Sequence, residues 1–311
     1  MEILENIPLS QFSSYKVGGR ARYIIRAGNN EEIAEAIKFS RSRELPLFIL
    51  GGGTNILFSD SGFSGVVLRP EILNLKLLGD TLTAGSGLLM ADLLNFLTNE
   101  GLSGLEWAGG LPGTLGGAIR GNAGAFGSEM KDNIFSVNSI KINNGEIEFI
   151  ERDSDKCKFG YRNSIFKNEA IKEIIIEAKF KLSRGNKEEI KTKILEKINY
   201  RKTRHPMEYP NAGSVFKNVA YESLNPEFQK VFKERVKQDP FPVVPTAILL
   251  SECGLKGLKS GGSQISEKHP NFIINLGSAT EKNISDLIEI MKNKVKEKFG
   301  VTLEEEIIRV Y

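Results

Sequence analysis

The sequence concentrates glycine in two windows, and glycine-rich backbone can bring N–H groups close to phosphate oxygens. Ten of the 31 glycines lie between residues 101 and 127, where no repeat period explains them. Ordering glycine costs more backbone entropy than ordering any other residue, so this concentration indicates a need for bare backbone. The second window, residues 51–55, reads Gly-Gly-Gly-Thr-Asn and directly follows an apolar stretch. Two such nests suit a diphosphate that carries a large ring system, so we interpret them as two halves of a nucleotide-cofactor site.

Neither window matches a standard nucleotide-binding motif. The sequence contains no GxxxxGK[ST] segment, and no GxGxxG fingerprint follows an expected strand. The alternative interpretation is a pair of glycine-rich turns that pack tightly for structural reasons alone. The occurrence of both windows favours binding, as do four side chains in them that can donate hydrogen bonds: Thr54, Asn55, Thr114 and Asn122.

An arginine next to an aromatic residue marks a third segment, residues 159–164. Arg162 follows Tyr161, and a guanidinium can form two parallel hydrogen bonds with a carboxylate. The alternative is a surface arginine that packs its aliphatic stem on Tyr161.

Ser214 lies between a glycine and a valine, where a serine is most simply a turn residue. In the functional alternative its hydroxyl is a proton donor beside Lys217 and Asn218. A hydroxyl is a weak acid, so it can act only on a very basic partner such as a carbanion or an enolate.

Three adjacent acidic residues, 304–306, precede the last apolar residues. Such a run is usually a solvated strand end. If residues 302–311 form a strand, neighbouring side chains point to opposite faces, and Glu306 can enter a site while Glu305 faces outward.

Composition excludes several classes of protein. The net charge of +3 and the lack of a basic block argue against a nucleic-acid binder. The apolar runs are too short to span a bilayer, and the N-terminus lacks the basic region of a signal peptide. Cys157 and Cys253 indicate a reducing compartment, the cytoplasm, without disulfides. His205 and His269 have no metal-site spacing, so we expect structural histidines and no metal.

Hydrophobic patterns predict the elements that carry these residues. Helices are expected at residues 31–43, 88–99, 186–204 and 280–299, and strands at 45–50, 66–68, 134–142, 146–150, 171–182 and 302–311. Asn30 and Thr280 are predicted N-caps, Gly101 and Gly300 are predicted helix ends, and residues 143–145 are a hairpin turn. Mixed helices and strands predict an α+β or α/β fold, with a second module from about residue 200.

Eight segments of the chain occur in an order that resembles the UDP-N-acetylenolpyruvoylglucosamine reductase family. They are SYKVGG at residues 14–19, GGGTN at 51–55, GLPGTLGGAIRGNAGAFG at 110–127, GYRNSIFK at 160–167, NAGSVFKN at 211–218, GLKG at 254–257, QISEKHPNF at 264–272 and LEEEI at 303–307. The resemblance covers nearly the whole chain, and the ordered set is far more specific than any one segment.

This resemblance implies an α+β fold with an FAD-binding region of the vanillyl-alcohol-oxidase (PCMH) type. That region is expected at residues 1–185, in subdomains of about 1–70 and 71–185, with a C-terminal α+β substrate domain at 200–311. NADPH is then expected to reduce the FAD, which passes hydride to the enolpyruvyl β-carbon of UDP-N-acetylglucosamine enolpyruvate. The product would be UDP-N-acetylmuramate, a peptidoglycan precursor, and no nucleic-acid or membrane partner is expected.

The resemblance also assigns roles to residues of this sequence. It makes Arg162 the arginine beside the substrate carboxylate, Ser214 the proton donor to the enolate carbon, and Glu306 the carboxylate that stabilises the intermediate or polarises the site. The expected substrate contacts are Tyr161, Lys217, Asn218 and, more weakly matched, Gln264. The expected cofactor-binding residues are Gly51, Gly52, Gly53, Thr54, Asn55, Gly110, Pro112, Gly113, Thr114, Gly117, Asn122 and Gly124.

Two rival functions remain open from the sequence. A flavoenzyme oxidase of the same cofactor fold, acting on an alcohol or hydroxy acid, would explain both glycine windows but not Ser214 together with Arg162 and Glu306. A nucleotide-binding regulatory module would bind its ligand without turnover and would show no flavin absorbance.

Overall fold

The computed structural model describes residues 1–143, 146–168, 173–238 and 241–311. The chain forms two compact units. Unit 1 comprises Met1–Ile7, Ala21–Gly52 and Ser64–Arg201, and unit 2 comprises Pro8–Arg20, Gly53–Phe63 and Lys202–Tyr311. Both units are discontinuous in sequence, because two N-terminal segments belong with the C-terminal part of the chain. The domain limits expected from the sequence, 1–185 and 200–311, stay a prediction.

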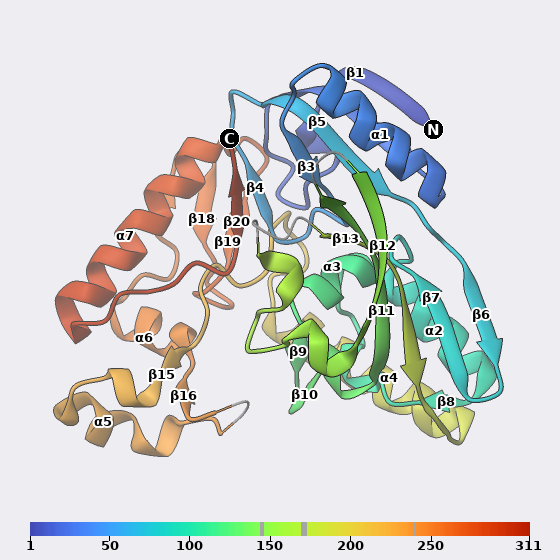
Figure 1. Cartoon of the computed structure of the whole chain (residues 1–311). Helices are drawn as coiled ribbons and strands as arrows, with labels where there is room; N and C mark the ends of the chain where they lie inside the picture. The colour runs from blue at the N-terminus through green and yellow to red at the C-terminus, as the bar shows by residue number, and fades with distance from the viewer. Residues whose placement is uncertain (144–145, 169–172, 239–240) are drawn as a thin grey trace. The chain divides into compact units, whose positions relative to one another are not determined.

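Unit 1 contains a four-stranded sheet packed against a helix (Figure 1). The strands, in the order β1-β2-β5-β3, are β1 (Glu2–Pro8), β2 (Arg20–Ala27), β5 (Phe63–Pro70) and β3 (Leu47–Ile49), and β3 runs parallel to β5. The helix α1 (Asn30–Ser42) buries Ile33, Ala36 and Ile37 against the sheet. These residues recur at i, i+3 and i+4, the spacing of one face of a helix.

The N-cap of α1 is Asn29, so the prediction of Asn30 was wrong by one residue. Oδ1 of Asn29 accepts a hydrogen bond from the backbone N–H of Glu32 at 2.8 Å. Either of two adjacent asparagines can cap a helix, and the extended backbone of Asn29, at φ −148°, selects the first of them.

The second sheet of unit 1 is antiparallel and carries the main core of this unit. Its strands, in the order β12-β11-β13-β7-β6, are β12 (Glu146–Asp153), β11 (Ile134–Asn143), β13 (Glu173–Lys181), β7 (Thr81–Gly85) and β6 (Leu75–Leu78). The central strand β13 buries Ile176, Ala178 and Phe180. The predicted turn residues 144–145 and strand residues 171–172 lie outside the described residues.

Helices of different lengths pack on this sheet and connect it to the glycine-rich window at residues 101–127. The helix α2 (Met90–Glu100) ends at Gly101, whose φ of 65° confirms the predicted cap, and α3 (Leu115–Arg120) follows. The helix α4 (Lys187–Arg204) buries Ile190 and Ile194. A Cβ atom at Gly109 would lie 2.5 Å from the carbonyl oxygen of Ile194, so α4 packs directly against the window.

A buried ion pair joins three neighbouring strands of the large sheet. Glu173 on β13 has a fully buried side chain, and it accepts hydrogen bonds from Arg152 Nε on β12 and from Ser139 Oγ on β11, both at 2.9 Å. Burial alone would raise the pKa of Glu173, but the hydrogen bonds from Arg152 and Ser139 lower it below its ordinary range. The carboxylate therefore stabilises the folded state in its charged form.

We expect Glu173→Ala to lower the free energy of unfolding at pH 7 by about 3–5 kcal/mol, because it leaves Arg152 without its partner. Since the folded-state pKa is lowered, this contribution is present above the unfolded glutamate pKa of about 4.3 and is lost as the pH falls below it. Urea titrations between pH 3 and pH 8 should show the variant and the parent converging in acid. The exposed pair of Lys156 and Asp153 is the control, and Asp153→Ala should change nothing measurable.

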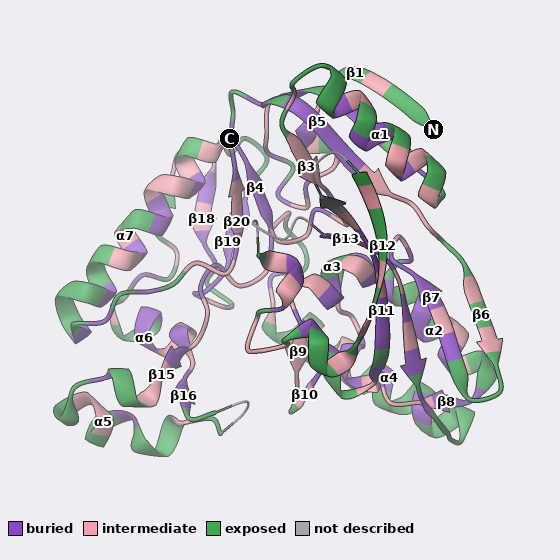
Figure 2. Cartoon of the chain, in the orientation of Figure 1, coloured by how far each residue is buried: buried purple, intermediate pink, exposed green. Residues whose placement is uncertain are grey.

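Unit 2 is built around the helix α7 (Glu281–Phe299), which begins at the predicted cap Thr280 and ends at the predicted Gly300. It contacts a three-stranded sheet of β17 (Lys259–Ser260), β18 (Ser263–Ile265) and β19 (Ile273–Asn275). Figure 2 shows β18 and β19 as largely buried strands. The buried face of α7 consists of Ile284, Leu287, Ile288, Met291, Val295 and Phe299.

The remaining elements are short. In unit 2 they are the strand pair β15 (Val219–Ala220) and β16 (Val243–Val244), the helices α5 (Pro226–Phe232) and α6 (Thr246–Glu252), and the parallel pair β4 (Ile56–Phe58) and β20 (Ile308–Val310). In unit 1 they are the strand pairs β8 (Leu102–Ser103) with β14 (Ser183–Arg184), and β9 (Gly124–Ala125) with β10 (Ser128–Glu129). Isolated 3₁₀ turns lie at η1 (Leu9–Gln11), η2 (Glu106–Ala108), η3 (Met130–Asp132), η4 (Ser154–Cys157), η5 (Ile165–Lys167), η6 (Tyr221–Ser223) and η7 (Lys233–Arg235).

The expected terminal strand at residues 302–311 is largely wrong, because only β20 is regular. Residues 304–307 instead pair irregularly with residues 215–217, a tertiary contact that the local pattern does not reveal. The argument that strand alternation places Glu305 and Glu306 on opposite faces therefore loses its premise.

Among the described residues, no helix combines the length and the apolar character needed to cross a bilayer. Both cysteines are free thiols. Burial raises the pKa of Cys157 to about 12, so this side chain stays protonated in the core of unit 1.

Candidate active site

The two glycine windows meet within unit 1. A Cβ atom on Gly51 would lie 2.7 Å from Oγ1 of Thr114, and a Cβ atom on Gly52 would lie 2.6 Å from the Cα of Gly113. The contact at Gly51 is with a side-chain hydroxyl, whereas the contact at Gly52 is with backbone, where no side chain fits. Glycine at position 52 is therefore required by the close approach of the loops, and the structure brings together these two parts of the predicted cradle.

The backbone at this meeting point offers unused hydrogen-bond donors. Within the described ranges, the N–H groups of Gly51, Gly52, Gly113 and Thr114 donate to no protein acceptor. Protein N–H groups are normally paired unless water or a ligand takes the bond. Closely spaced N–H groups beside the first turn of α3 are suited to the oxygens of a diphosphate.

The rest of the window at residues 51–55 belongs to unit 2. Gly53 has a φ of +64°, and a Cβ there would lie 1.8 Å from the carbonyl oxygen of Phe12, so the protein itself requires glycine. Nδ2 of Asn55 donates to the backbone carbonyl of Glu306 at 2.9 Å. The cofactor contacts of Gly53, Thr54 and Asn55 stay predictions, while Asn55 already links its loop to a predicted catalytic residue.

Other glycines of the window at residues 101–127 have packing reasons of their own. A Cβ at Gly110 would lie 3.1 Å from the Cδ of Arg201, and one at Gly124 would lie 2.7 Å from the Cγ of Glu129. These contacts agree with the structural alternative for both positions. The cofactor contacts predicted for Gly110, Pro112, Gly117 and Gly124 stay predictions.

Asn122 is buried and connects the window to the segment that carries Arg162. Its Nδ2 donates to Glu129 Oε2 and to the carbonyl of Gly160, each at 3.0 Å, and its Oδ1 accepts from the N–H of Lys131 at 3.1 Å. These bonds show a positioning role within the protein. Its predicted cofactor contact stays a prediction.

Tyr161 and Arg162 form the tip of a tight turn. Gly160 and Asn163 exchange two backbone hydrogen bonds of 3.0 Å, and Arg162 has a φ of 53°. A positive φ at the third position is typical of a type II turn, where glycine is the usual residue. A strained backbone at a non-glycine residue is common at binding sites. The guanidinium carbon lies 5.2 Å from the centre of the Tyr161 ring, as the packing alternative expects.

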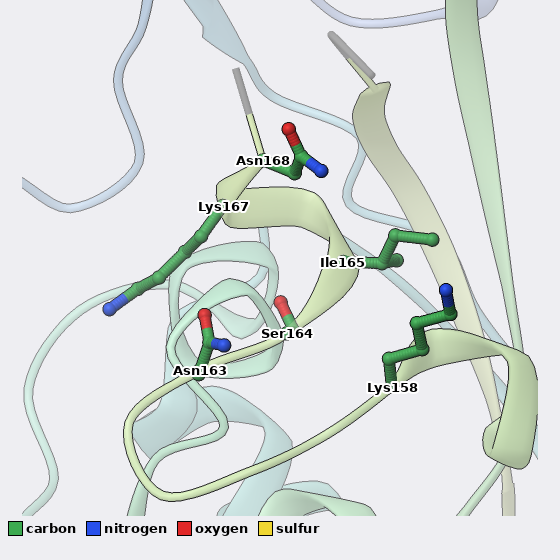
Figure 3. Close-up of a pocket in the computed structure, with 6 residues that line it drawn as sticks. All are labelled: Lys158, Asn163, Ser164, Ile165, Lys167 and Asn168. Atoms are coloured by element: carbon green, nitrogen blue, oxygen red, sulfur yellow. The ribbon is translucent and has the colours of Figure 1, made fainter. Parts of the chain in front are cut away.

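A cavity of about 350 Å³ lies next to this turn and is lined by Lys158, Asn163, Ser164, Ile165, Lys167 and Asn168. Figure 3 shows that the side chains of Lys158 and Lys167 point to different sides. Nζ of Lys167 donates to the carbonyl of Arg162 at 2.6 Å. Because the two ammonium groups do not converge, we assign no anion to this cavity; Lys167 instead supports the turn.

Arg201, on α4, is a charged residue of unit 1 that the sequence did not single out. Its Nε donates to the carbonyl of Gly109 at 2.9 Å, while its buried Nη2 has no hydrogen-bond partner among the described residues. Burial, and then the positive charge of Arg162, lower the pKa of Arg201. A buried guanidinium that has an unused donor and feels the positive charge of Arg162 favours an anionic ligand. One basic residue among several on a charged helix gives no local signal of this role.

Ser214 and Glu306 come together in unit 2. The carbonyl of Val215 accepts hydrogen bonds from the N–H groups of Glu306 at 2.8 Å and Ile307 at 3.4 Å, and the N–H of Lys217 donates to the carbonyl of Glu304 at 3.0 Å. Ser214 is half-buried, and its hydroxyl has no partner among the described residues. The third predicted catalytic residue, Arg162, belongs to unit 1.

Three predicted substrate contacts in unit 2 already have protein partners. The ammonium of Lys217 pairs with Glu304, and Oδ1 of Asn218 accepts from the N–H of Thr246 at 3.3 Å. Gln264, on β18, donates from Nε2 to the carbonyl of Gly257 at 3.1 Å. Lys217 and Asn218 follow Ser214 closely in the sequence. The substrate contacts of Lys217, Asn218 and Gln264 stay predictions.

Glu305 is part of an ion cluster with Lys292 of α7 and Arg309 of β20. Its carboxylate accepts from Arg309 Nε at 2.8 Å and from Lys292 Nζ at 2.5 Å. Burial raises the pKa of Glu305, but these hydrogen bonds outweigh it and lower the pKa below its ordinary range. Glu305 therefore has a structural set of partners.

The two histidines pack on each other and on Phe272. The ring centres of His205 and His269 are 5.4 Å apart, and burial followed by the charge of His205 lowers the pKa of His269 to about 4. His269 is thus neutral at pH 7, in agreement with a structural histidine. No group of three or more potential metal ligands occurs among the described residues.

Comparison with known proteins places this site in a family. Residues 21–150 match the model of an FAD-binding domain, and residues 205–310 match that of the UDP-N-acetylenolpyruvoylglucosamine reductase C-terminal domain. The reductase of Lachnoclostridium phytofermentans is 37% identical, covering 97% of this chain and 91% of its own. That of Caldanaerobacter subterraneus is 39% identical over the same shares. The crystal structure of the Thermus caldophilus reductase is 30% identical, with a TM-score of 0.77, and covers 100% of this chain and 98% of its own.

These matches confirm the α+β class, with an FAD-binding region and a family-specific C-terminal domain. The residues of unit 1 fit the cofactor: the loops at Gly51, Gly52, Gly113 and Thr114 provide free N–H groups at a cradle that any Cβ would fill, and Arg201 provides a buried, unpaired donor. On identity and coverage, the chain belongs to the UDP-N-acetylenolpyruvoylglucosamine reductase family.

Proposed function

We propose that this enzyme uses NADPH and FAD to reduce the enolpyruvyl ether of UDP-N-acetylglucosamine to UDP-N-acetylmuramate, a step of peptidoglycan precursor synthesis in the cytoplasm. Family membership over nearly the whole chain supports the reaction, and two free thiols agree with a reducing compartment. The observation that carries the proposal is the pairing of the backbone after Ser214 with Glu306. An alcohol oxidase of the same cofactor fold has no need of a hydroxyl acid beside a carboxylate.

Bound FAD supplies the hydride for the β-carbon of the double bond, after taking two electrons from NADPH. Arg162 binds the substrate carboxylate through its guanidinium and stabilises the negative charge that grows there. Ser214 gives its Oγ proton to the adjacent carbon, forming the second C–H bond, and regains a proton from solvent. Glu306 polarises this centre. Tyr161, Lys217, Asn218 and Gln264 orient the sugar nucleotide.

The visible spectrum of the purified protein tests this function. We expect flavin absorbance that NADPH bleaches under anaerobic conditions and that the enolpyruvyl sugar nucleotide restores. Bleaching by an alcohol but not by NADPH would indicate the oxidase, and binding of nucleotide without flavin absorbance would indicate the regulatory module. A colourless protein that takes up no added FAD would contradict the proposal.

A further inference from the structure

Residues 215–217, directly after Ser214, form hydrogen bonds on two sides. A single asparagine, Asn271, provides the bonds on one side. The carbonyl of Asn271 accepts from the N–H of Val215 at 2.8 Å. Its side chain then bonds both polar backbone groups of Phe216: Oδ1 accepts from the N–H at 3.1 Å, and Nδ2 donates to the carbonyl at 2.8 Å. Asn271 thus bonds the backbone of Val215 and Phe216 as a neighbouring strand would.

With the opposite side included, every backbone donor and acceptor of these three residues is paired. The carbonyl of Val215 and the N–H of Lys217 bond residues 304–307, as described above. The last group, the carbonyl of Lys217, accepts from Oγ1 of the buried Thr246 at 2.5 Å. A shift of this segment would therefore break several hydrogen bonds at once.

The hydrogen bonds of Asn271 lie in the interior. Asn271 is 3% exposed, Phe216 is 1% exposed and Val215 is fully buried. A buried donor or acceptor that loses its partner is costly, so these bonds favour one position of the segment. Asn271 holds that position through side-chain atoms, which a substitution can remove without touching Ser214.

Ser214 itself has few restraints of its own. Its hydroxyl has no partner among the described residues, and it follows Gly213, which has a φ of +78° and no atom within 4 Å of a Cβ position. The direction of the hydroxyl is therefore governed mainly by the anchored residues that follow it. Proton transfer to carbon requires the donor within a few tenths of an ångström of its productive place.

We propose that Asn271 is a positioning residue that holds Ser214 for proton transfer to the substrate. This inference rests on the proposed function, in which the Ser214 Oγ–H bond breaks and a C–H bond forms at the carbon next to the carboxylate. Asn271 touches neither the substrate nor the cofactor in this scheme, and it acts through the backbone of Val215 and Phe216.

Asn275 provides a matched control in the same unit. It is 4% exposed, its Nδ2 donates to the carbonyl of Tyr15 at 2.8 Å, and its Oδ1 accepts from the N–H of Gly277 at 2.7 Å. Asn275→Ala therefore removes an equally buried amide with backbone partners, but those partners lie outside residues 214–218. A general loss of stability should affect Asn271→Ala and Asn275→Ala alike.

The test separates the two half-reactions of the FAD-loaded enzyme by anaerobic stopped-flow absorbance. We expect Asn271→Ala to leave flavin reduction by NADPH unchanged and to slow reoxidation by the enolpyruvyl sugar nucleotide by about 100-fold, as for a misplacement of about 1 Å. Its reoxidation should also show a larger solvent deuterium isotope effect, because proton transfer becomes limiting. Asn275→Ala should leave both half-reactions unchanged.

Two further variants test the positioning role in addition to Asn271→Ala. Thr246→Val removes only the bond to the carbonyl of Lys217, so it should show a smaller effect of the same kind if Asn271→Ala does not fold. In the double variant Ser214→Ala/Asn271→Ala, we expect no loss beyond that of Ser214→Ala. Equal effects of Asn271→Ala and Asn275→Ala on reoxidation, or no effect of Thr246→Val, would overturn the positioning role. Normal reoxidation in Ser214→Ala alone would overturn the proposed role of Ser214 instead.

Discussion

Replacing Ser214 by alanine is expected to slow reoxidation of the reduced flavin by the enolpyruvyl sugar nucleotide by about 10²- to 10⁴-fold, the usual contribution of a general acid. Flavin reduction by NADPH should keep its rate, because that half-reaction needs no proton from Ser214. Among the described residues the hydroxyl has no protein partner, so its removal breaks no hydrogen bond between them. Anaerobic stopped-flow absorbance measures both rates in one preparation.

Ser223→Ala is the control for this experiment. Ser223 lies in the same unit, and its Oγ donates to the carbonyl of Ala220 at 2.6 Å. Both half-reactions should be unchanged in this variant. If Ser214→Ala also reoxidises at the parent rate, the proton comes from another group and Ser214 leaves the mechanism.

Gly52→Ala is expected to weaken FAD binding by roughly 10- to 100-fold, because the added methyl meets backbone that must move. A Cβ at Gly52 would lie 2.6 Å from the Cα of Gly113 and 3.2 Å from the N of Thr114. Overpacking at a well-packed position costs about 1–3 kcal/mol, and separation of the two loops removes the shared donors for the diphosphate. Titration of the apoprotein with FAD, followed by flavin fluorescence, gives the affinity.

The matched control for Gly52 is Gly121, which lies in the other glycine window. A Cβ there meets only the carbonyl oxygen of Gly117 at 3.6 Å, an ordinary contact, and its φ of −85° suits any residue. Gly121→Ala should bind FAD like the parent. Equal affinities for Gly52→Ala and the parent would show that the contact between the loops does not serve the cofactor.

Local signals in the sequence predicted the elements well where a helix carries its own caps. Thr280, Gly101 and Gly300 act at the expected helix ends, because capping depends on a few neighbouring residues. The expected strand at residues 302–311 failed for the opposite reason. Its residues 304–307 bond a segment some ninety positions earlier in the chain, and no local period encodes such a partner.

The residues of the candidate site also divide into those with a local signal in the sequence and those without one. The glycines at positions 51 and 52 are visible in composition, and at position 52 close backbone approach excludes every other residue. Arg201 and Asn271 are not visible, because one is a single cation on a charged helix and the other a single amide in a loop. Their importance arises from burial and from partners far away in sequence, so only the folded chain reveals it.

The parallel strand pair of unit 2 has a consequence for synthesis on the ribosome. β4 and β20 align Phe58 with Val310, and Asn275 bonds the carbonyl of Tyr15 across 260 positions. The early segments around Tyr15 and Phe58 therefore lack these partners until Asn275 and Val310 have been synthesised. Contacts of such long range fold slowly, so nascent chains should expose these apolar segments to chaperones for most of their elongation time.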